Sequence, residues 1–489
     1  MKSKIQKYKY NLIFFYVILL VFTIILCCSA FSMTTNMMNS VKFIGIIGGL
    51  LFFAYIILQY KISGTFLNFG FIFSILLFLF CFGQFLLYGF GIEYDYFFMN
   101  SHYRSFFGND NYYLLYGEVI TIISIACFWL AILLTTNTTN KPKRVSSKPT
   151  VSDMLLRRVA LIVFCISAII MIPFKLYLLF YSMENGGYFA VYDIATPMIV
   201  RIVGVFFVPS TIALLISYKR KAQFKWIALM ILLYAIVGLL TGGRSEPIVL
   251  LTAIAIVYLY GKKFATIRKV SIVLLLYVAV TVLVTVADNR TVANRSIVNI
   301  ANAFFKTLVS FRAVTQLVGE MGFSGSSMIW TVYLVKTGQQ GLFYGMTYFS
   351  DVLNMIPSTL DFSGLLNSVY RYAYLESWLT ELLGFNFGVG FNLIAEAYLN
   401  VGILSPIIMF TYGVILNKIF NHIYDDDKWG QYKAIVMFAV LMTLPRRATM
   451  YFADQWVLCV ISIWLLCRLV ELCGAKYVLK ERSHGKVAH

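Results

Sequence analysis

The sequence predicts an all-α membrane protein that crosses the bilayer about twelve times. Hydrophobic residues make up 60% of the 489 residues, and the mean hydropathy is +0.80, a balance that soluble domains of this size do not have. Apolar runs long enough to cross a hydrocarbon core of about 30 Å follow one another along the chain. Basic residues gather in every second segment that connects two apolar runs, which is the pattern of the positive-inside rule.

The apolar runs and the charge clusters that bound them give the predicted spans. These are residues 11–32, 42–60, 66–90, 113–135, 159–181, 196–217, 226–242, 247–261, 270–287, 391–417, 432–450 and 453–470. The first run follows several lysines and lacks a clean small-residue cleavage site, so we expect a retained anchor rather than a cleaved signal peptide. Both chain ends then lie in the cytoplasm.

The net charge of +19 orients the chain in the membrane and does not indicate nucleic acid as a partner. The basic clusters fall on the predicted cytoplasmic side, at 141–148, 157–158, 219–225, 262–269 and the C-terminus. The eight Cys lie within or at the ends of apolar runs, and the four His are scattered. We therefore predict no disulfide framework, no metal site and no cofactor.

Three regions follow from this layout. Residues 1–287 hold spans one to nine, 288–390 form a long outer loop, and 391–489 hold spans ten to twelve with the cytoplasmic tail. A loop of that length without structure of its own is unusual, so we expect amphipathic helices on the outer membrane surface, for example Ala301–Glu320 and Leu365–Leu383. Glu376 within this loop is expected to be solvated.

An earlier outer loop, Ile92–Tyr112, is rich in Tyr and Phe. Aromatic side chains at this level are typical of an interfacial belt, where one end of the ring is apolar and the other is wet. The alternative is that these rings stack on sugars.

Arginines stand at the meeting point of two apolar runs near the C-terminus. Between Lys433 and Pro445 the apolar sequence spans about 11 residues, or roughly 17 Å as a helix, which is too short to cross the membrane. Arg446 and Arg447 are therefore predicted to lie at depth, where a guanidinium costs several kcal/mol unless it lines a wet cavity or holds an anion. The alternative is a structural ion pair, for example with Asp454.

A second pair of short runs meets at Thr241–Pro247, the sequence TGGRSEP. Two glycines beside Arg244 bring backbone amides close to whatever the arginine holds, which suits a phosphate. The alternative is a tight turn whose arginine reaches lipid headgroups. Glu246 in the same motif is assigned to substrate binding. Arg290 and Arg295, just past the ninth span, either bind an anion or are solvated.

The tenth span begins with polar residues at fourfold spacing. Asn392, Glu396 and Asn400 share one helix face, and Glu396 lies roughly 33 Å above Lys418, at the outer boundary. The stripe is predicted to form a cavity wall, with Asn392 and Asn400 assigned to substrate binding. Its carboxylate is either a general base or the partner of an arginine.

Three motifs together resemble the Wzy-type O-antigen or capsule polysaccharide polymerases. They are Leu240–Pro247 (LTGGRSEP), Asn392–Gly402 (NLIAEAYLNVG) and Pro445–Arg447 (PRR). The layout of about twelve spans, with the longest outer loop between spans nine and ten, is also similar. The resemblance covers nearly the whole chain in organisation.

The resemblance implies a GT-C-like fold and a metal-independent glycosyltransferase of the bacterial inner membrane, with its active site facing the periplasm. The growing glycan on undecaprenyl pyrophosphate would be the donor, and the non-reducing end of a new lipid-linked repeat unit the acceptor. Arg244, Arg446 and Arg447 would hold the pyrophosphate, with Arg290 and Arg295 in a similar place. Glu396 would orient or deprotonate the acceptor, and a chain-length regulator protein is a further expected partner.

Two other activities fit much of the same sequence. A lipid-linked oligosaccharide flippase would be expected to show repeated halves and short loops, whereas this chain has a long outer loop and no visible repeat. An O-antigen ligase would be expected to carry an important histidine in its long outer loop, and residues 288–390 contain none.

Overall fold

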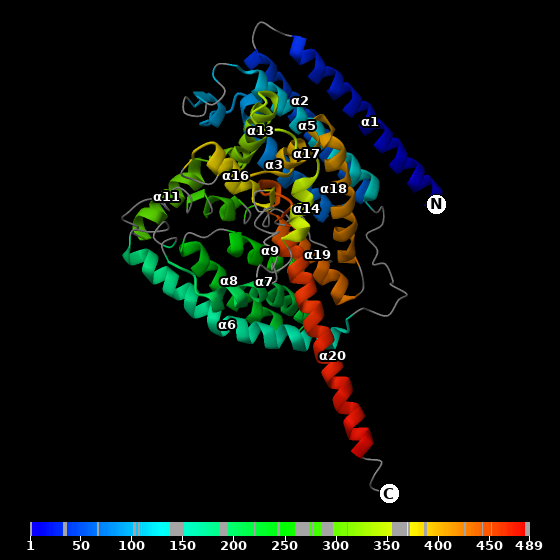
Figure 1. Ribbon diagram of the computed structural model, residues 1–489, viewed down its shortest axis with the longest axis vertical. Coiled ribbons are helices and arrows are strands. Elements are labelled where there is room, and N and C mark those ends of the chain that lie inside the picture. Colours follow the sequence, from blue (N-terminus) through cyan, green and yellow to red (C-terminus); the bar gives the residue numbers. More distant parts are fainter. Residues whose placement is uncertain are drawn as a thin grey trace. The chain divides into compact units, whose positions relative to one another are not determined.

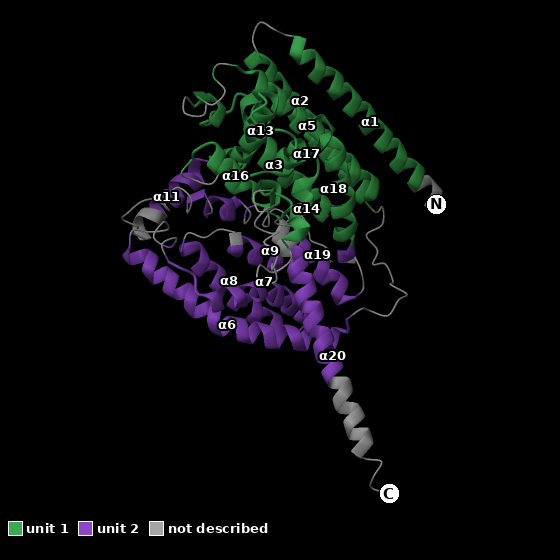
Figure 2. Cartoon of the chain, in the orientation of Figure 1, with its two compact units in different colours: residues 1–141, 312–421, 441–454 green, residues 142–311, 422–440, 455–489 purple. Residues whose placement is uncertain are grey.

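The computed structural model is helical in the residues that it describes, and these contain no strand. Two compact units alternate along the sequence (Figure 2): unit 1 is 1–141, 312–421 and 441–454, and unit 2 is 142–311, 422–440 and 455–489. The described residues are 2–32, 37–65, 68–100, 104–105, 108, 110–136, 151–185, 191, 194–219, 221–241, 245–259, 274, 277–282, 284–285, 297–310, 312–354, 369, 372–385, 389–424, 427–442, 444–450 and 452–484.

Unit 1 is built around helix α5, which packs against α1, α2, α3, α13 and α18. Figure 1 labels these helices. The α-helices of the unit are α1 (Lys2–Ser32), α2 (Met37–Ser63), α3 (Phe69–Gly89), α5 (Tyr112–Thr135), α12 (Ala313–Gly322), α13 (Ser326–Lys336), α14 (Met346–Leu353), α16 (Leu375–Leu382), α17 (Leu393–Val401) and α18 (Ser405–Phe420). Short 3₁₀ turns are η1 (Phe97–Met99), η3 (Phe323–Gly325), η5 (Gly402–Leu404) and η7 (Leu444–Arg446).

Aromatic side chains and close helix contacts hold the core of unit 1 together. The Trp129 and Tyr55 rings stack with centroids 4.7 Å apart, and the Tyr55 hydroxyl donates to Ser74 Oγ at 2.9 Å. Both rings are fully buried, so the hydroxyl has found the partner that a buried phenol needs. Where α2 crosses α3, a Cβ added at Gly45 would stand 2.5 Å from the Phe85 carbonyl oxygen, so this crossing requires glycine.

Part of the predicted outer loop packs into this core. The expected helix Ala301–Glu320 is divided into α11 (Ile297–Ser310) and α12, and α12 packs on α3. The next helix, α13, lies against α5 and α17 and buries Trp330 completely. Most of α13 is buried, including Ser327 and Thr331, whose hydroxyls have hydrogen-bond partners within the protein, so α13 is not a surface helix. Of the expected helix Leu365–Leu383, the structure shows α16, and residues 365–368 lie outside the described residues.

Unit 2 contains the paired helices α6 and α7, with α8, α9 and α20 packed on them. Its α-helices are α6 (Asp153–Glu184), α7 (Met198–Tyr218), α8 (Gln223–Leu240), α9 (Ser245–Leu259), α11, α19 (Lys428–Leu441, whose last residue falls in unit 1) and α20 (Leu458–His484). The 3₁₀ turn η6 is Asn421–Tyr424, and the π-helical segment η8 is Phe452–Val457. Ser152 caps α6 by accepting from the Leu155 amide, and Pro173 and Pro209 lie inside α6 and α7.

Eight of the described helices are long and apolar enough to cross a membrane, which supports a multi-pass membrane protein. The count of twelve predicted from the sequence stays a prediction, because the eight helices are those of the described residues only. The described apolar helix at the eighth predicted span is short, Glu246–Tyr258, and α19 has 14 residues. Half of the predicted span 270–287 lies outside the described residues.

The crossing of α2 and α3 gives a stability test. Gly45→Ala places a methyl group against the Phe85 carbonyl and should lower the free energy of unfolding by about 1–3 kcal/mol, seen as a lower melting temperature in detergent. Gly341→Ala is the matched control because a Cβ there meets nothing within 4 Å, and it should change stability by less than about 0.5 kcal/mol. Equal melting temperatures for the two variants would contradict the close crossing.

Candidate active site

The turn that carries Arg446 and Arg447 belongs to unit 1 and is fixed through its backbone. The Arg447 amide donates to the Leu444 carbonyl at 2.8 Å, and the Arg446 carbonyl accepts from the Phe391 amide at 3.4 Å. Leu444 and Pro445 are buried, because the start of the turn packs against α3. The two arginine side chains therefore project from a seated backbone rather than from a loose loop.

The carboxylate of Glu396 holds the far end of this turn. Glu396 has no exposed surface, and both of its oxygens accept hydrogen bonds. Oε1 accepts from Thr347 Oγ1 at 2.9 Å, and Oε2 accepts from the amide and the hydroxyl of Thr449, each at 2.7 Å. Tyr412 forms a further hydrogen bond with the Thr449 hydroxyl. Among the described residues, the donors to this carboxylate are thus hydroxyl and amide groups, and none is an arginine.

Asn392 and Asn400 tie the same helix, α17, to its neighbours. Asn392 is the N-cap: its Oδ1 accepts from the amides of Ile394 and Ala395, while its Nδ2 donates to Ser324 and Ser327. Asn400 Nδ2 donates to Thr347 Oγ1 at 2.7 Å, and its Oδ1 accepts from the Gly345 amide.

Residues 392, 396 and 400 all have no exposed surface. The polar stripe predicted from the sequence therefore joins α17 to α13 and α14, and its side chains are satisfied within the protein.

The two guanidinium groups differ in their surroundings. Arg446 is exposed. Arg447 Nη1 lies 3.6 Å from Glu376 Oε2, and 42% of the Arg447 side chain and 36% of the Glu376 side chain are exposed. Burial raises the pKa of the Glu376 carboxyl, and the charges of Arg447 and Arg446 lower it in part. Glu376 was expected to be a solvated surface residue, whereas here it faces the arginine turn.

Gly390 lies directly against Arg446. Its φ is +71°, and an added Cβ would stand 3.5 Å from Arg446 Nε. The backbone here needs the left-handed conformation that glycine adopts readily, and it leaves the guanidinium room beside the chain.

A second anchored carboxylate, Glu246, lies in unit 2 at the start of α9, two residues after Arg244. Glu246 Oε2 pairs with Lys175 Nζ at 2.8 Å, and the Tyr234 hydroxyl donates to Oε1 at 2.8 Å. These contacts join α9 to α6 and α8. The role expected for Glu246 is substrate binding, and its contacts in the structure hold the start of α9 against α6 and α8. Arg244 itself lies outside the described residues, as do Arg290 and Arg295.

The sequence analysis missed several of these groups. Lys175 could have been found, since a lysine inside an apolar run is costly in a membrane and implies a partner. Thr347 and Thr449 carried no signal, because a threonine in an apolar stretch is ordinary. Among the described residues, no cluster of three or more His, Cys, Asp or Glu side chains could hold a metal ion.

The anchoring of the turn can be tested through Thr449. Thr449→Val keeps the side-chain shape and removes the hydroxyl that donates to Glu396, so the free energy of unfolding should fall by about 1–3 kcal/mol. Thr411→Val is the matched control, because the exposed Thr411 hydroxyl bonds only to the Ile407 carbonyl of its own helix. Thermal unfolding in detergent measures both, and an unchanged melting temperature for Thr449→Val would show that the bond contributes little.

Comparison with known proteins gives one informative result. No curated protein and no solved structure matches the chain significantly. The family profile described as O-antigen polysaccharide polymerase Wzy matches residues 11–476, which is nearly the whole chain and includes both arginine motifs and α17. The chain belongs to the O-antigen polysaccharide polymerase Wzy family.

Proposed function

We propose that this protein polymerises undecaprenyl-pyrophosphate-linked oligosaccharide repeat units at the periplasmic face of the inner membrane. It transfers the growing glycan from its lipid pyrophosphate to the non-reducing end of a new lipid-linked unit. The observation that carries this proposal is the arginine turn 446–447, which is seated on α3 and anchored by the buried carboxylate of Glu396. The family assignment supplies the class of reaction.

Arg446 and Arg447 are suited to the leaving pyrophosphate. A guanidinium presents donors in a planar fork that fits phosphate oxygens and keeps its charge at any working pH. As the anomeric C–O bond to the pyrophosphate breaks, negative charge builds on the departing oxygen, and groups already in place stabilise it without reorganising. The exposed side chain of Arg446 and the half-exposed side chain of Arg447 leave these donors within reach of a ligand.

Glu396 is then a positioning residue. A general base must reach the proton that it removes, but Glu396 has no exposed surface and both its oxygens are occupied by Thr347 and Thr449. Its effect on the reaction passes through Thr449 to the arginine turn.

Glu376 is the better candidate for the general base. Its side chain is 36% exposed and lies beside Arg447. In the proposed step, the carboxylate takes the proton of the acceptor hydroxyl while that oxygen bonds to the anomeric carbon and the pyrophosphate leaves. A carboxyl whose pKa is raised by burial is a stronger base than a solvated one.

The remaining sequence-based assignments stay proposals. Arg244 binds pyrophosphate on a turn held by Glu246, and Arg290 and Arg295 contribute at the outer edge. Asn392 and Asn400 support the site by fixing α17. The loop 288–390 is placed in the periplasm, regions 1–287 and 391–489 in the membrane, and both chain ends in the cytoplasm. The GT-C-like fold, metal independence and a chain-length regulator as partner belong to the same proposal.

Removal of one arginine tests the proposed function. Arg447→Ala should lower polymerisation by about 10²–10³-fold, the usual cost of losing a group that stabilises a developing oxyanion. The measurement is the length distribution of surface glycan at equal protein level, repeated with purified protein and synthetic lipid-pyrophosphate repeat units. Arg468→Ala is the control, because Arg468 is exposed on α20 and pairs with Glu471. Full-length polymer from Arg447→Ala would reject the assignment.

The role of Glu376 predicts a pH dependence. Because burial raises the pKa of this carboxyl, the base is lost to protonation at a higher pH than for a solvated glutamate, and activity should fall as the pH drops through that raised value. Glu376→Gln should reduce kcat by about 10²–10⁴-fold, and its residual activity should lack this acid limb. An acid limb identical to that of the wild type would exclude Glu376 as the base.

A further inference from the structure

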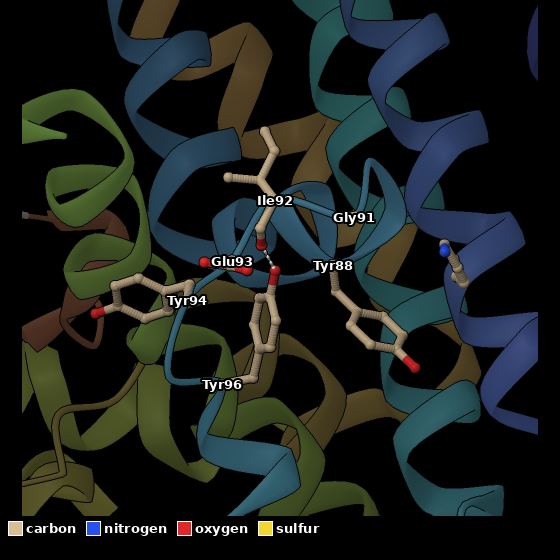
Figure 3. Close-up of a pocket in the computed structure, with 7 residues that line it drawn as sticks. Tyr88, Gly91, Ile92, Glu93, Tyr94 and Tyr96 are labelled. Atoms are coloured by element: carbon tan, nitrogen blue, oxygen red, sulfur yellow. Dashed lines mark hydrogen bonds between the residues drawn. The ribbon is translucent and has the colours of Figure 1, made fainter. Parts of the chain in front are cut away.

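The segment after α3 forms a hollow in unit 1 that the proposed reaction does not use. Its volume is about 330 Å³, and Lys42, Tyr88, Glu93, Tyr94 and Tyr96 line it, together with the turn at Gly91. Figure 3 shows the ring of Tyr96 between those of Tyr94 and Tyr88. The ring centroids of Tyr96 and Tyr88 are 5.3 Å apart, and those of Tyr94 and Tyr96 are 6.0 Å apart.

Contacts with neighbouring residues hold the rings of Tyr94 and Tyr96 in place. Tyr96 stacks on Phe98 with centroids 5.4 Å apart, and Phe98 is fully buried. The Tyr96 hydroxyl donates to the Ile92 carbonyl, which is the dashed line in Figure 3. The ring of Tyr94 rests on α12, where a Cβ added at Gly319 would stand 2.2 Å from it. These contacts fix the aromatic faces before any ligand arrives.

Polar groups stand beside the rings. Lys42 and Glu93 are exposed, and neither makes a hydrogen bond or an ion pair with another residue that the structure describes. One cation and one anion give the hollow no net charge, so it has no preference for an anionic ligand. Ligand sites commonly combine aromatic walls with a few polar groups that fix orientation.

We propose that this hollow binds neutral sugar residues of the glycan chain. The C–H face of a pyranose is apolar and packs on an aromatic face, while its hydroxyls donate to the Glu93 carboxylate and accept from the Lys42 ammonium. A role as an interfacial belt explains the pattern less well, because the Tyr96 hydroxyl donates to the Ile92 carbonyl of the same segment and is not left for lipid headgroups. This inference rests on the proposed function and adds a glycan subsite to it.

The test measures glycan binding without the pyrophosphate. Full-length protein in nanodiscs of neutral lipid is titrated with lipid-free surface polysaccharide released from the producing strain, and binding is followed by calorimetry and saturation-transfer NMR. Tyr94→Ala and Glu93→Gln should each weaken binding about 3- to 10-fold, whereas Tyr94→Phe, which keeps the ring, should bind as the wild type does. Tyr10→Ala, at an exposed tyrosine on α1, is the control.

Gly319→Ala is a second variant that distinguishes loss of binding from loss of folding. It displaces the Tyr94 ring without changing a residue that lines the hollow. It should also weaken binding, with an unchanged melting temperature. Wild-type affinity in Tyr94→Ala, or binding that responds to anionic lipid instead of to the glycan, would overturn the proposal. Arg447→Ala separates the two ideas. It should lower polymerisation by about 10²–10³-fold and retain glycan binding. Full polymer from Arg447→Ala would therefore reject the proposed function and leave the result for the hollow intact.

Discussion

The buried carboxylate of Glu396 is the interaction on which the candidate site of unit 1 depends. Removing an ionised carboxylate from water is costly unless hydrogen bonds replace its hydration. Here a backbone amide and the hydroxyls of two threonines do so, and two of these three donors belong to Thr449. The energy that stabilises the carboxylate therefore also fixes the turn, so that the position of Arg446 and Arg447 follows from the cost of burying Glu396.

Unit 2 also contains a carboxylate that is held by other side chains, but the kinds of partner differ. Glu246 follows Arg244 by two residues and is held by Lys175 and Tyr234, so this acid is satisfied by one charged group and one hydroxyl, whereas Glu396 is satisfied by two hydroxyls and an amide. In unit 1 a buried carboxylate ties the arginine turn to α17, and in unit 2 the carboxylate two residues after Arg244 ties the start of α9 to α6 and α8. A turn without such a tie would lose more backbone conformational entropy each time it bound an anion.

Those parts of the arrangement that depend on one continuous stretch of sequence could be predicted. Apolar runs predicted the membrane helices, since an unsatisfied backbone is not tolerated in lipid. The spacing of four residues predicted that Asn392, Glu396 and Asn400 share one helix face. The short apolar runs on either side of Arg446 and Arg447 indicated that these arginines are unusual. What the sequence could not show is pairing across distance: Thr347 and Thr449 stand 49 and 53 residues from Glu396. The burial of α13 could not be predicted for the same reason, because a segment bounded by charged residues has the sequence pattern of a loop.

The two sites proposed in unit 1 bind their ligands in different ways. In the proposed reaction the pyrophosphate headgroup is the same in every cycle, so fixed arginines can be matched to it and can act strongly at the moment when charge develops. The glycan beyond it grows with each cycle and must move past its contacts, so a neutral tyrosine hollow that holds sugars weakly is compatible with turnover, whereas a tight glycan site would retain the product. Strong charge at the bond being broken and weak aromatic contact along the chain are therefore the combination that repeated transfer requires.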